Sequence, residues 1–308
     1  MVIISLLEKK DAENIMKIYQ ECFDSAFQIQ EDKLNQSVFD ASDFCGEASL
    51  IAKDENTGET VGCIVIKLSD NQQLYPNTAW ITLLLVKPEY RRRGIGRCMY
   101  EKSEKVLRDK GVHKIYIGQD FANLFSGIPS PQKENEEFFR MCGFILNKDK
   151  HYDLEADIVN NKKIDDFNTV EFEKEFITDI LENEDSDRLL TFLREEFPGR
   201  WEYEAETYLG NKGKLENIVI LKNRTDSGIL GYCMLAVHED RSGGLGPIGI
   251  AHSIRGRRVG DYILSQSLLQ LRRLGAEKVC IDWTILKDFY GQFDFLPVRT
   301  FRSGYKEF

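Results

Sequence analysis

Two short stretches rich in arginine and glycine carry the strongest chemical signal in this sequence. They are RRRGIG at 91–96 and RGRRVG at 255–260; a strand-like apolar run precedes each one and a helical pattern follows it. A glycine-rich turn at a helix N-terminus presents consecutive backbone N–H groups to an anion, and the helix dipole adds about +0.5 of an elementary charge there. Flanking guanidinium groups add charge-assisted hydrogen bonds. The two stretches therefore predict a site for a ligand of pyrophosphate size.

Two better-known phosphate motifs do not fit these stretches. A nucleotide P-loop requires the pattern G-x-x-x-x-G-K-[ST], which the sequence does not contain. The dinucleotide fingerprint G-x-G-x-x-G fails because Met99 stands where a third small residue is required after Gly94 and Gly96. A turn whose arginines are merely solvated would have the same composition, but its occurrence twice in the same surroundings favours an anion site.

The elements around the two turns repeat along the chain, and the repeat indicates how the turns are positioned. Each half reads as a helix, a hairpin, a strand, the arginine–glycine turn, a second helix, a strand, a short helix and a final strand. Extra residues, among them the loop GIPSP at 127–131, are inserted in the first half and form either an acceptor-side loop or a surface excursion. The matching segments are 11–23 with 185–197, 49–68 with 217–237, 91–96 with 255–260, 111–118 with 275–282, and 138–144 with 289–295.

This order of elements predicts the fold class. A strand–helix–strand unit is normally right-handed and parallel, so each half should be an α/β sandwich around one mixed sheet. A chain of 308 residues is long enough for two such domains. The polar stretch at 147–168 is the natural boundary, and the predicted domains are residues 1–155 and residues 170–308.

The residues around the first turn resemble a known family. LLLVKPEYRRRGIGRCMYEKSEKVL at 83–107 is similar to motif A of the GNAT superfamily of acyl-CoA-dependent N-acyltransferases. GPIGIAHSIRGRRVGDYIL at 246–264 resembles a divergent copy of the same motif, and FYGQFDF at 289–295 resembles a segment near the end of that domain. The resemblance implies two tandem GNAT-like domains, each a mixed, mostly antiparallel sheet with a parallel, splayed pair of strands and flanking helices.

The resemblance also implies a co-substrate and its site. In this family the acetyl-CoA pyrophosphate lies on the motif A turn, which by match is the backbone of Arg92–Arg97, with Gly94 and Gly96 as positions of close approach. The pantetheine arm pairs with the main chain of the preceding strand, by match Leu83–Val86, mirrored in the second half by Pro247–Ala251. The candidate coenzyme residues are Leu84, Leu85, Val86, Arg91, Arg92, Arg93, Gly94, Ile95, Gly96 and Arg97.

Catalysis is harder to assign because the two halves diverge. A lysine-like amine is neutral only about once in 2,500 molecules at pH 7, so its attack on the thioester requires a base or a water chain. The family commonly protonates the leaving thiolate from a tyrosine; the first half has Phe139 at that position and the second has Tyr290. The second half, however, has Arg258 in place of the first glycine of the turn. Either the first domain binds acetyl-CoA and uses another proton source (Tyr116, Asp120 or water), or the second works through Tyr290, our candidate catalytic residue.

Composition narrows the remaining function classes. The net charge of −10 argues against a nucleic-acid surface, and no apolar run approaches the ~20 residues that a membrane span requires. Seven cysteines without a C-x-x-C pair read as reduced thiols, and four histidines lack the spacing of metal ligands, so we predict no metal site. The N-terminus resembles no secretory signal, which favours the cytoplasm.

The acceptor is the least determined feature. We expect the acceptor to be a small-molecule or peptide amine. A monomer and a homodimer are both compatible with the sequence. The stretch EFPGRWEYEAETY at 196–208 is either an aromatic cluster over the edge of the core or an acceptor pocket for a cationic amine. A non-catalytic acyl-CoA sensor is the alternative function, because Phe139 and Arg258 both depart from the family pattern.

Overall fold

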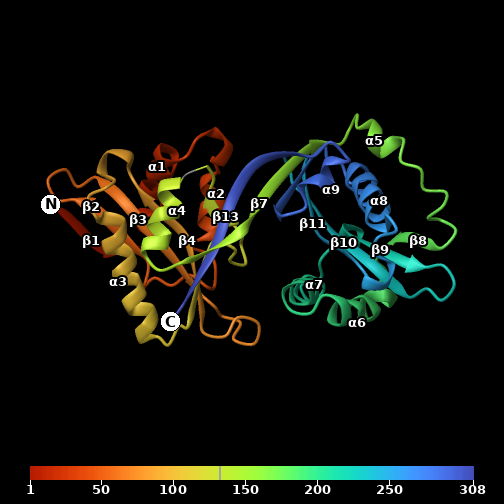
Figure 1. Ribbon diagram of the computed structural model, residues 1–308, viewed down its shortest axis with the longest axis horizontal. Helices are drawn as coiled ribbons and strands as arrows, with labels where there is room; N and C mark the ends of the chain where they lie inside the picture. Colours follow the sequence, from red (N-terminus) through yellow and green to blue (C-terminus); the bar gives the residue numbers. More distant parts are fainter. Residues whose placement is uncertain (132) are drawn as a thin grey trace. The chain divides into compact units, whose positions relative to one another are not determined.

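The chain folds into two compact units that interleave in sequence. The structure, a computed structural model, describes residues 1–131 and 133–308. One unit consists of Met1–Tyr152 together with Arg299–Phe308, and the other consists of Asp153–Val298 (Figure 1). This division differs from the domains predicted from the sequence, 1–155 and 170–308, because the last ten residues of the chain belong with the first unit.

The first unit is built on a twisted mixed sheet in the order β1-β2-β3-β4-β5. Neighbouring strands pair antiparallel except β4 and β5, which are parallel. Helices α1 and α2 pack on one face of the sheet and α3 and α4 pack on the other. The elements are β1 (Val2–Leu6), α1 (Ala12–Cys22), α2 (Glu31–Ser37), β2 (Leu50–Asp54), β3 (Thr60–Leu68), β4 (Thr78–Val86), α3 (Ile95–Asp109), β5 (Lys114–Ile117), β6 (Ile128–Pro129) and α4 (Lys133–Met141).

The parallel pair in the first unit is short and then opens. β4 and β5 pair only from Thr78 with Lys114 to Ile81 with Ile117. At the next residue, Thr82, the register between β3 and β4 shifts, which marks a β-bulge. A bulge adds a residue to one strand and bends it. The carboxyl half of β4 therefore runs on beside β3 without β5 as a neighbour, and this is the splayed pair predicted from the sequence.

The second unit repeats this arrangement. Its strands β12, β11, β10, β9 and β8 follow one another in that order, with β11 and β12 parallel over Ser242–Gly244 and Lys278–Cys280. Adjacent residues of β10 point to opposite faces: Tyr232 meets rings of α6 and α7, while Cys233 lies against α8. The elements are α5 (Lys162–Asp165), β8 (Phe176–Ile180), α6 (Ser186–Glu196), α7 (Arg200–Gly210), β9 (Ile218–Asn223), β10 (Ile229–Val237), β11 (Ser242–Ile250), α8 (Val259–Arg273), β12 (Lys278–Thr284) and α9 (Lys287–Gly291).

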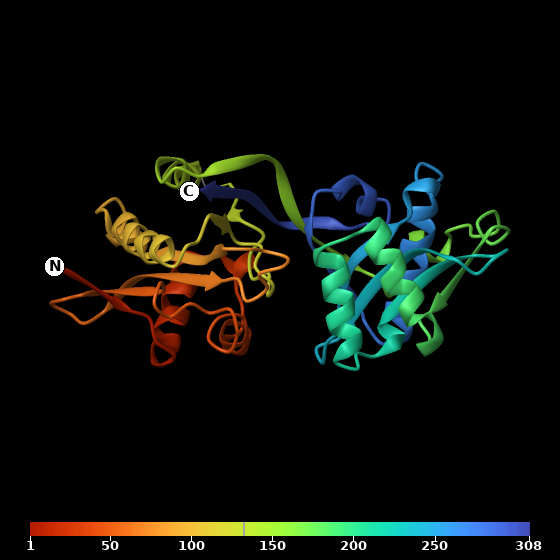
Figure 2. The same cartoon turned by 90° about the horizontal axis from the view of Figure 1, so that it is seen from below.

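Two long strands, β7 (Ile145–Asp157) and β13 (Leu296–Glu307), are shared between the units. β13 begins in the second unit, but Tyr305–Glu307 pair with β5 and Phe301 pairs with β6 in the first unit. Phe301 is fully buried there, in the core to which residues of α1 and α2 also belong. Figure 2 shows the dark blue end of β13, marked C, with the elements of the first unit. Each half was expected to close its own sheet with its own final strand, whereas the structure completes the first sheet with the end of the chain.

The duplication extends to a buried ion pair that the sequence comparison did not single out. In the first unit Lys53 Nζ on β2 lies 3.0 Å from Asp11 Oδ1 just before α1, and in the second Lys222 Nζ on β9 lies 2.6 Å from Asp185 Oδ2 just before α6. Both aspartates are buried. The same ion pair at the same place in both units ties the first helix of each unit to its second strand.

Candidate active site

The first arginine–glycine turn has the backbone of an anion cradle. Arg92 and Gly94 both adopt left-handed conformations, with φ of 60° and 80°, and α3 begins at Ile95. The Gly94 C=O accepts the first helical hydrogen bond, from Cys98 N–H at 2.9 Å. The first N–H groups of a helix have no partner inside it. Those of Ile95, Gly96 and Arg97 therefore remain available to a ligand.

The arginines of this turn divide into anchored and free side chains. Arg91 Nε donates to the Val86 C=O at 3.0 Å, and Arg93 donates to the Glu89 C=O at 2.7 Å. Arg97 Nε pairs with Glu101 at 2.9 Å on the exposed face of α3. The guanidinium of Arg92 makes no hydrogen bond or ion pair within the described part of the chain, and it is exposed. Arg92 is thus the cation most available to an anionic ligand.

The second turn has the same backbone with glycine and arginine exchanged. Gly256 and Arg258 adopt φ of 77° and 61°, at the places of Arg92 and Gly94. A side chain at position 258 disfavours a left-handed turn, but Arg258 takes the left-handed conformation and occupies the N-cap position of α8. Its Nε pairs with Asp261 at 2.7 Å, and Asp261 is buried in the first turn of α8, where the first unit has Arg97. This helix N-terminus already holds a carboxylate of its own chain.

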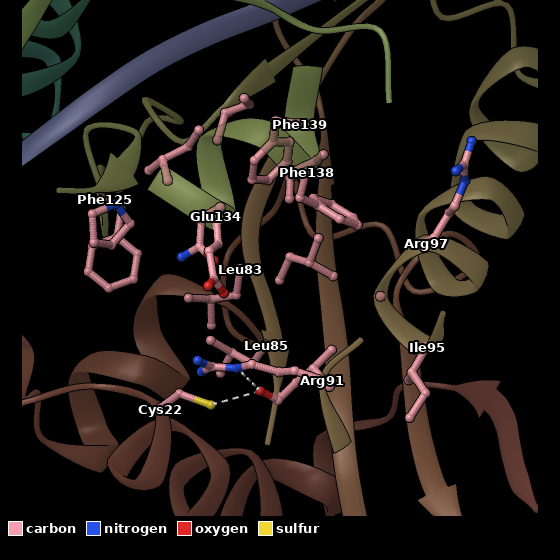
Figure 3. Close-up of a pocket in the computed structure, with 18 of the residues that line it drawn as sticks. Cys22, Leu83, Leu85, Arg91, Ile95, Arg97, Phe125, Glu134, Phe138 and Phe139 are labelled. Atoms are coloured by element: carbon pink, nitrogen blue, oxygen red, sulfur yellow. Dashed lines mark hydrogen bonds between the residues drawn. The ribbon is translucent and has the colours of Figure 1, made fainter. Parts of the chain in front are cut away.

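A cavity of about 410 Å³ opens beside the first turn, where β4 and β5 separate (Figure 3). All the predicted coenzyme residues line it except Arg93. Its walls come from both helical faces of the sheet: Ile95 and Phe139 belong to the core under α3 and α4, and Leu83 and Phe125 to the core under α1 and α2. The cavity therefore passes through the sheet at the splay. The remaining lining residues are Cys22, Phe23, Ile81, Thr82, Tyr90, Ile117, Gly118, Gly127, Ile128, Pro129, Glu134, Asn135, Phe138 and Met141.

The main chain of β4 faces this cavity at alternate residues. Lys87 N–H donates to the Val61 C=O of β3 at 2.9 Å. Successive residues of a strand direct their N–H and C=O groups to opposite sides, so those of Leu84 and Val86 point away from β3 into the splay. The Val86 C=O is taken by Arg91 and, at 3.5 Å, by Cys22 Sγ (Figure 3). The N–H groups of Leu84 and Val86 are left to a ligand, whereas Leu85 pairs toward β3.

The inserted loop of the first half forms one wall of the cavity. Ile128–Pro129 is the short strand β6, which pairs with β13, and Ile128 is buried. Gly127 has φ of 144°, and a Cβ there would lie 2.6 Å from the Arg302 C=O, so no larger residue fits. The sequence left two interpretations of this loop, an acceptor-side loop and a surface excursion. Because the loop is paired with β13 and lines the cavity, it is not a surface excursion.

Aromatic rings pack over the strand of the second unit that corresponds to β4. A Cβ on Gly249 of β11, the counterpart of Leu85, would lie 2.5 Å from the Phe197 ring and 3.0 Å from the Trp201 ring. The two rings are 4.9 Å apart and both lie near Tyr232. The aromatic part of 196–208 thus packs on the sheet. A second cavity of about 400 Å³ lies away from β11, beside α5, and is lined by Lys162, Lys163, Asp166, Phe167, Asn168, Phe172 and Arg258.

The candidate proton donors lie in different surroundings. Tyr290, 5 % exposed, belongs to the core of the second unit and does not line the first-unit cavity; burial raises its pKa. Phe139 lines the cavity but has no proton to donate. Tyr116 is not among the lining residues. Asp120 is fully buried, bound to Lys67 at 3.0 Å and to Thr82 Oγ1 at 2.8 Å, so its carboxylate is held inside the protein.

One lining residue carries a charge that the sequence analysis missed. Glu134, in the first turn of α4, contributes the acidic side chain among the described lining residues. In the sequence Glu134 lies between the inserted loop at 127–131 and the segment FFRMCGF at 138–144. Its position shortly before that segment was the one signal that could have identified it. Charged residues in helix first turns are common, so the sequence signal was weak.

No group of three or more His, Cys, Asp or Glu side chains suited to a metal occurs among residues 1–131 and 133–308. In the same residues no helix is both long and apolar enough to cross a membrane.

The sequence matches one family model and a small number of related proteins. Residues 12–144 match the Acetyltransferase (GNAT) family. A probable N-acetyltransferase 14 of Danio rerio is 29% identical over 92 residues, covering 30% of this chain and 28% of that protein. An uncharacterized N-acetyltransferase of Chlorobaculum tepidum is 31% identical over 81 residues, covering 26% of this chain and 49% of that protein. The chain thus spans less than half the length of both relatives.

Solved structures match over nearly the whole chain. The GCN5-related glucosamine N-acetyltransferase region of a fungal multi-domain GH3 beta-N-acetylglucosaminidase superposes with a TM-score of 0.87 at 20% identity, covering 99% of this chain and 38% of that one. A GCN5-related N-acetyltransferase from Sphaerobacter thermophilus gives 0.75 at 12% identity, covering 99% and 95%. A tandem GNAT protein of the clavulanic acid biosynthesis pathway gives 0.67 at 14%, covering 100% and 98%. At these identities the matches show the fold, and they confirm the predicted α/β class.

Proposed function

We propose that this chain, of which residues 12–144 match the GNAT acetyltransferase family, transfers an acetyl group from acetyl-CoA to an amine in the cavity of the first unit. One observation carries the proposal: the splay of β4 and β5, the open main chain of β4 and the arginine–glycine turn all border the same cavity. A turn, a groove and an opening through the sheet suit the diphosphate, the pantetheine arm and the thioester in that order.

The fit of acetyl-CoA follows from the groups that are free. The diphosphate would lie on the N–H groups of Ile95, Gly96 and Arg97 with the Arg92 guanidinium beside it, because anions bind favourably at helix N-termini. The N–H groups of Leu84 and Val86 would hold the pantetheine amides. A Cβ on Gly96 would already lie 3.5 Å from Val86 and 3.7 Å from Phe138, so its absence widens the passage between the turn and the strand.

The chemistry then requires little from side chains. An amine attacks the thioester carbon directly, and a main-chain N–H at the splay stabilises the oxyanion that forms. The departing thiolate has a reference pKa of ~8.5, so it leaves without a strong acid. Phe139 stands where the family commonly places its tyrosine, and proton delivery through water replaces the missing hydroxyl. The role of Tyr290 as an acid in the second unit stays a prediction.

The acceptor class is proposed from the same cavity. We propose a primary amine, and glucosamine belongs in the first panel of acceptors because the structural relative with a TM-score of 0.87 is a glucosamine N-acetyltransferase region. The alternative function is an acyl-CoA sensor, which is favoured by Phe139 in place of tyrosine. A sensor would bind coenzyme A in the same cavity and release no thiol.

A thiol-release assay separates the two functions. The protein is mixed with acetyl-CoA and a panel of amines that includes glucosamine, a lysine-containing peptide and small alkylamines, and free coenzyme A thiol is measured over time. We expect amine-dependent thiol release that Gly94→Val abolishes and Gly256→Val leaves intact. Tight coenzyme A binding with no amine-dependent release from any acceptor would favour the sensor.

A further inference from the structure

Glu134 is an exposed residue that lines the cavity of the first unit, so its carboxylate is open to a ligand that enters there. Its side chain lines the cavity and makes no hydrogen bond or ion pair to any residue that the structure describes. Figure 3 shows it extending from α4 toward Leu83 on β4. The neighbouring acids of α4 differ: Glu136 binds Arg140 at 2.8 Å, and Glu137, which is exposed as Glu134 is, does not line the cavity.

The coenzyme cannot be the partner of this carboxylate. Acetyl-CoA carries a diphosphate, and like charges in one cavity repel each other. The cationic lining residues are on the turn side, where Arg91 is anchored to the Val86 C=O and Arg97 to Glu101. A cationic group of the second substrate is therefore a better match for this carboxylate than the anionic coenzyme is.

The walls of the cavity toward α1 supply the rest of the recognition. Phe23, Leu83 and Phe125 line the cavity there and belong to the core packed under α1 and α2. The Phe23 and Phe125 rings lie 5.2 Å apart at an interplanar angle of 55°. Aromatic faces attract both cations and apolar groups. In contrast to a sugar site, this part of the cavity offers few hydroxyl partners.

We propose that the acceptor is a primary amine carrying an aromatic or branched apolar body, with its ammonium on Glu134 and its body against Phe23 and Phe125. This inference rests on the proposed function and narrows its substrate. Filling of the cavity by both substrates removes water from the carboxylate–ammonium pair, and loss of water disfavours charged forms. One ammonium proton passes to Glu134 and on to water, the free amine attacks the thioester carbon, the C–S bond breaks, and a second proton from the nitrogen reaches the thiolate.

Binding of a probe pair tests the recognition step without requiring turnover. The affinities of 2-phenylethylamine and its neutral analogue 2-phenylethanol are measured by calorimetry, with and without saturating coenzyme A, for the full-length wild type, Glu134→Gln and Glu137→Gln. Glu137→Gln is the matched control, since it makes the same change one turn away and outside the cavity. We expect the wild type and Glu137→Gln to bind the amine about tenfold more tightly than the alcohol, and Glu134→Gln to lose that preference.

The outcomes distinguish this inference from the proposed function. The assignment of Glu134 is overturned if Glu134→Gln still binds the amine more tightly than the alcohol. It is also overturned if the wild type binds the two probes equally or binds neither. Both results hold whether or not acetyl transfer occurs. Loss of the preference in Glu134→Gln supports it even if no thiol is released. Where thiol is released, Glu134→Gln is expected to lower kcat/KM for 2-phenylethylamine at least about 100-fold and Glu137→Gln to leave it within twofold.

Discussion

The two arginine–glycine turns share a backbone and differ in what surrounds them. Each has two left-handed residues before its helix, Arg92 and Gly94 in one unit and Gly256 and Arg258 in the other. Arginine and glycine are exchanged between the two left-handed positions. The glycines alone therefore do not show which of the two turns binds a ligand. The two units also differ beside the turn: in the first unit Leu85 lines a cavity, and in the second unit the Phe197 and Trp201 rings pack over the corresponding Gly249.

Charge separates the two turns as well. Arg97 of the first turn corresponds to Asp261 of the second, whose buried carboxylate lies in the first turn of α8. A carboxylate in the first turn of a helix interacts favourably with the same helix-dipole charge that attracts an anionic ligand. Arg257 and Arg258 are paired with Glu175 and Asp261. The second turn therefore has carboxylate partners for Arg257 and Arg258, whereas Arg92 of the first turn has none among the described residues.

Removing the buried ring of β13 should have the largest effect. Phe301→Ala truncates a fully buried side chain of the first unit and is expected to lower its free energy of unfolding by about 3–5 kcal/mol. Urea unfolding measures the loss, and Leu296→Ala on the exposed part of the same strand is the control. Coenzyme A binding should weaken with Phe301→Ala although the residue lies about 200 positions after the turn. Equal stability of the two variants would show that the first unit does not need the end of the chain.

Substitution of a glycine in each turn should have the next largest effect, on coenzyme A affinity. Gly94→Val forces a β-branched residue to φ near 80°, which costs about 1–3 kcal/mol and displaces the N–H groups of the cradle. We expect coenzyme A affinity, measured by calorimetry, to fall about 100-fold. Gly256→Val makes the same change in the second turn and should leave the affinity within twofold. The reverse pattern would move the coenzyme to the second unit.

A tyrosine at position 139 should raise the rate of acetyl transfer in the first unit. Phe139→Tyr places a hydroxyl in the lining of the cavity, and we expect kcat for acetyl transfer to rise about tenfold because the thiolate gains a proton donor. Tyr290→Phe removes the corresponding hydroxyl from the second unit, where burial raises its pKa, and should change kcat less than twofold. Steady-state rates with a fixed amine test both variants. A hundredfold loss with Tyr290→Phe would assign catalysis to the second unit.

The smallest effect concerns a buried charge cluster present in the first unit. Lys67 lies 3.3 Å from Asp43 and 3.0 Å from Asp120, and burial raises the pKa of Asp43. The folded state therefore holds the Asp43 proton more tightly than the unfolded state, and wild-type stability declines as the pH rises through that pKa. Asp43→Asn should be more stable than the wild type by about 1 kcal/mol at pH 8, with little difference at pH 4. Urea unfolding at both values checks this, and a less stable variant at pH 8 would show that the Lys67 pair outweighs burial.

The sequence was most informative where one local pattern dictates one local structure. The turn at 91–96, the splayed strand before it and the repeat of both follow from glycine spacing, apolar runs and their recurrence, and the structure has them in these places. The pairing of β13 with β5 could not be predicted in this way, because a strand with alternating apolar residues could pair with the sheet of either unit. The same holds for Arg258, whose left-handed φ is set by the surrounding turn against its own preference.

The candidate site shows the same limit. Leu84 and Val86 were selected by resemblance, but only the strand pairing shows that Leu85 between them faces β3. Glu134 and the wall at Gly127–Pro129 belong to segments that sequence analysis treats as surface, and they reach the cavity because β6 pairs with a strand from the end of the chain. Such positions depend on contacts between distant residues, which no local pattern contains.

The most direct measurement is the electron density of a crystal of the full chain soaked in saturating coenzyme A. The account predicts a diphosphate on the amides of Ile95–Arg97, with the pantetheine arm along Leu84 and Val86 and the sulfur at the splay of β4 and β5. Density on the turn at 255–260 with the first turn vacant would contradict it.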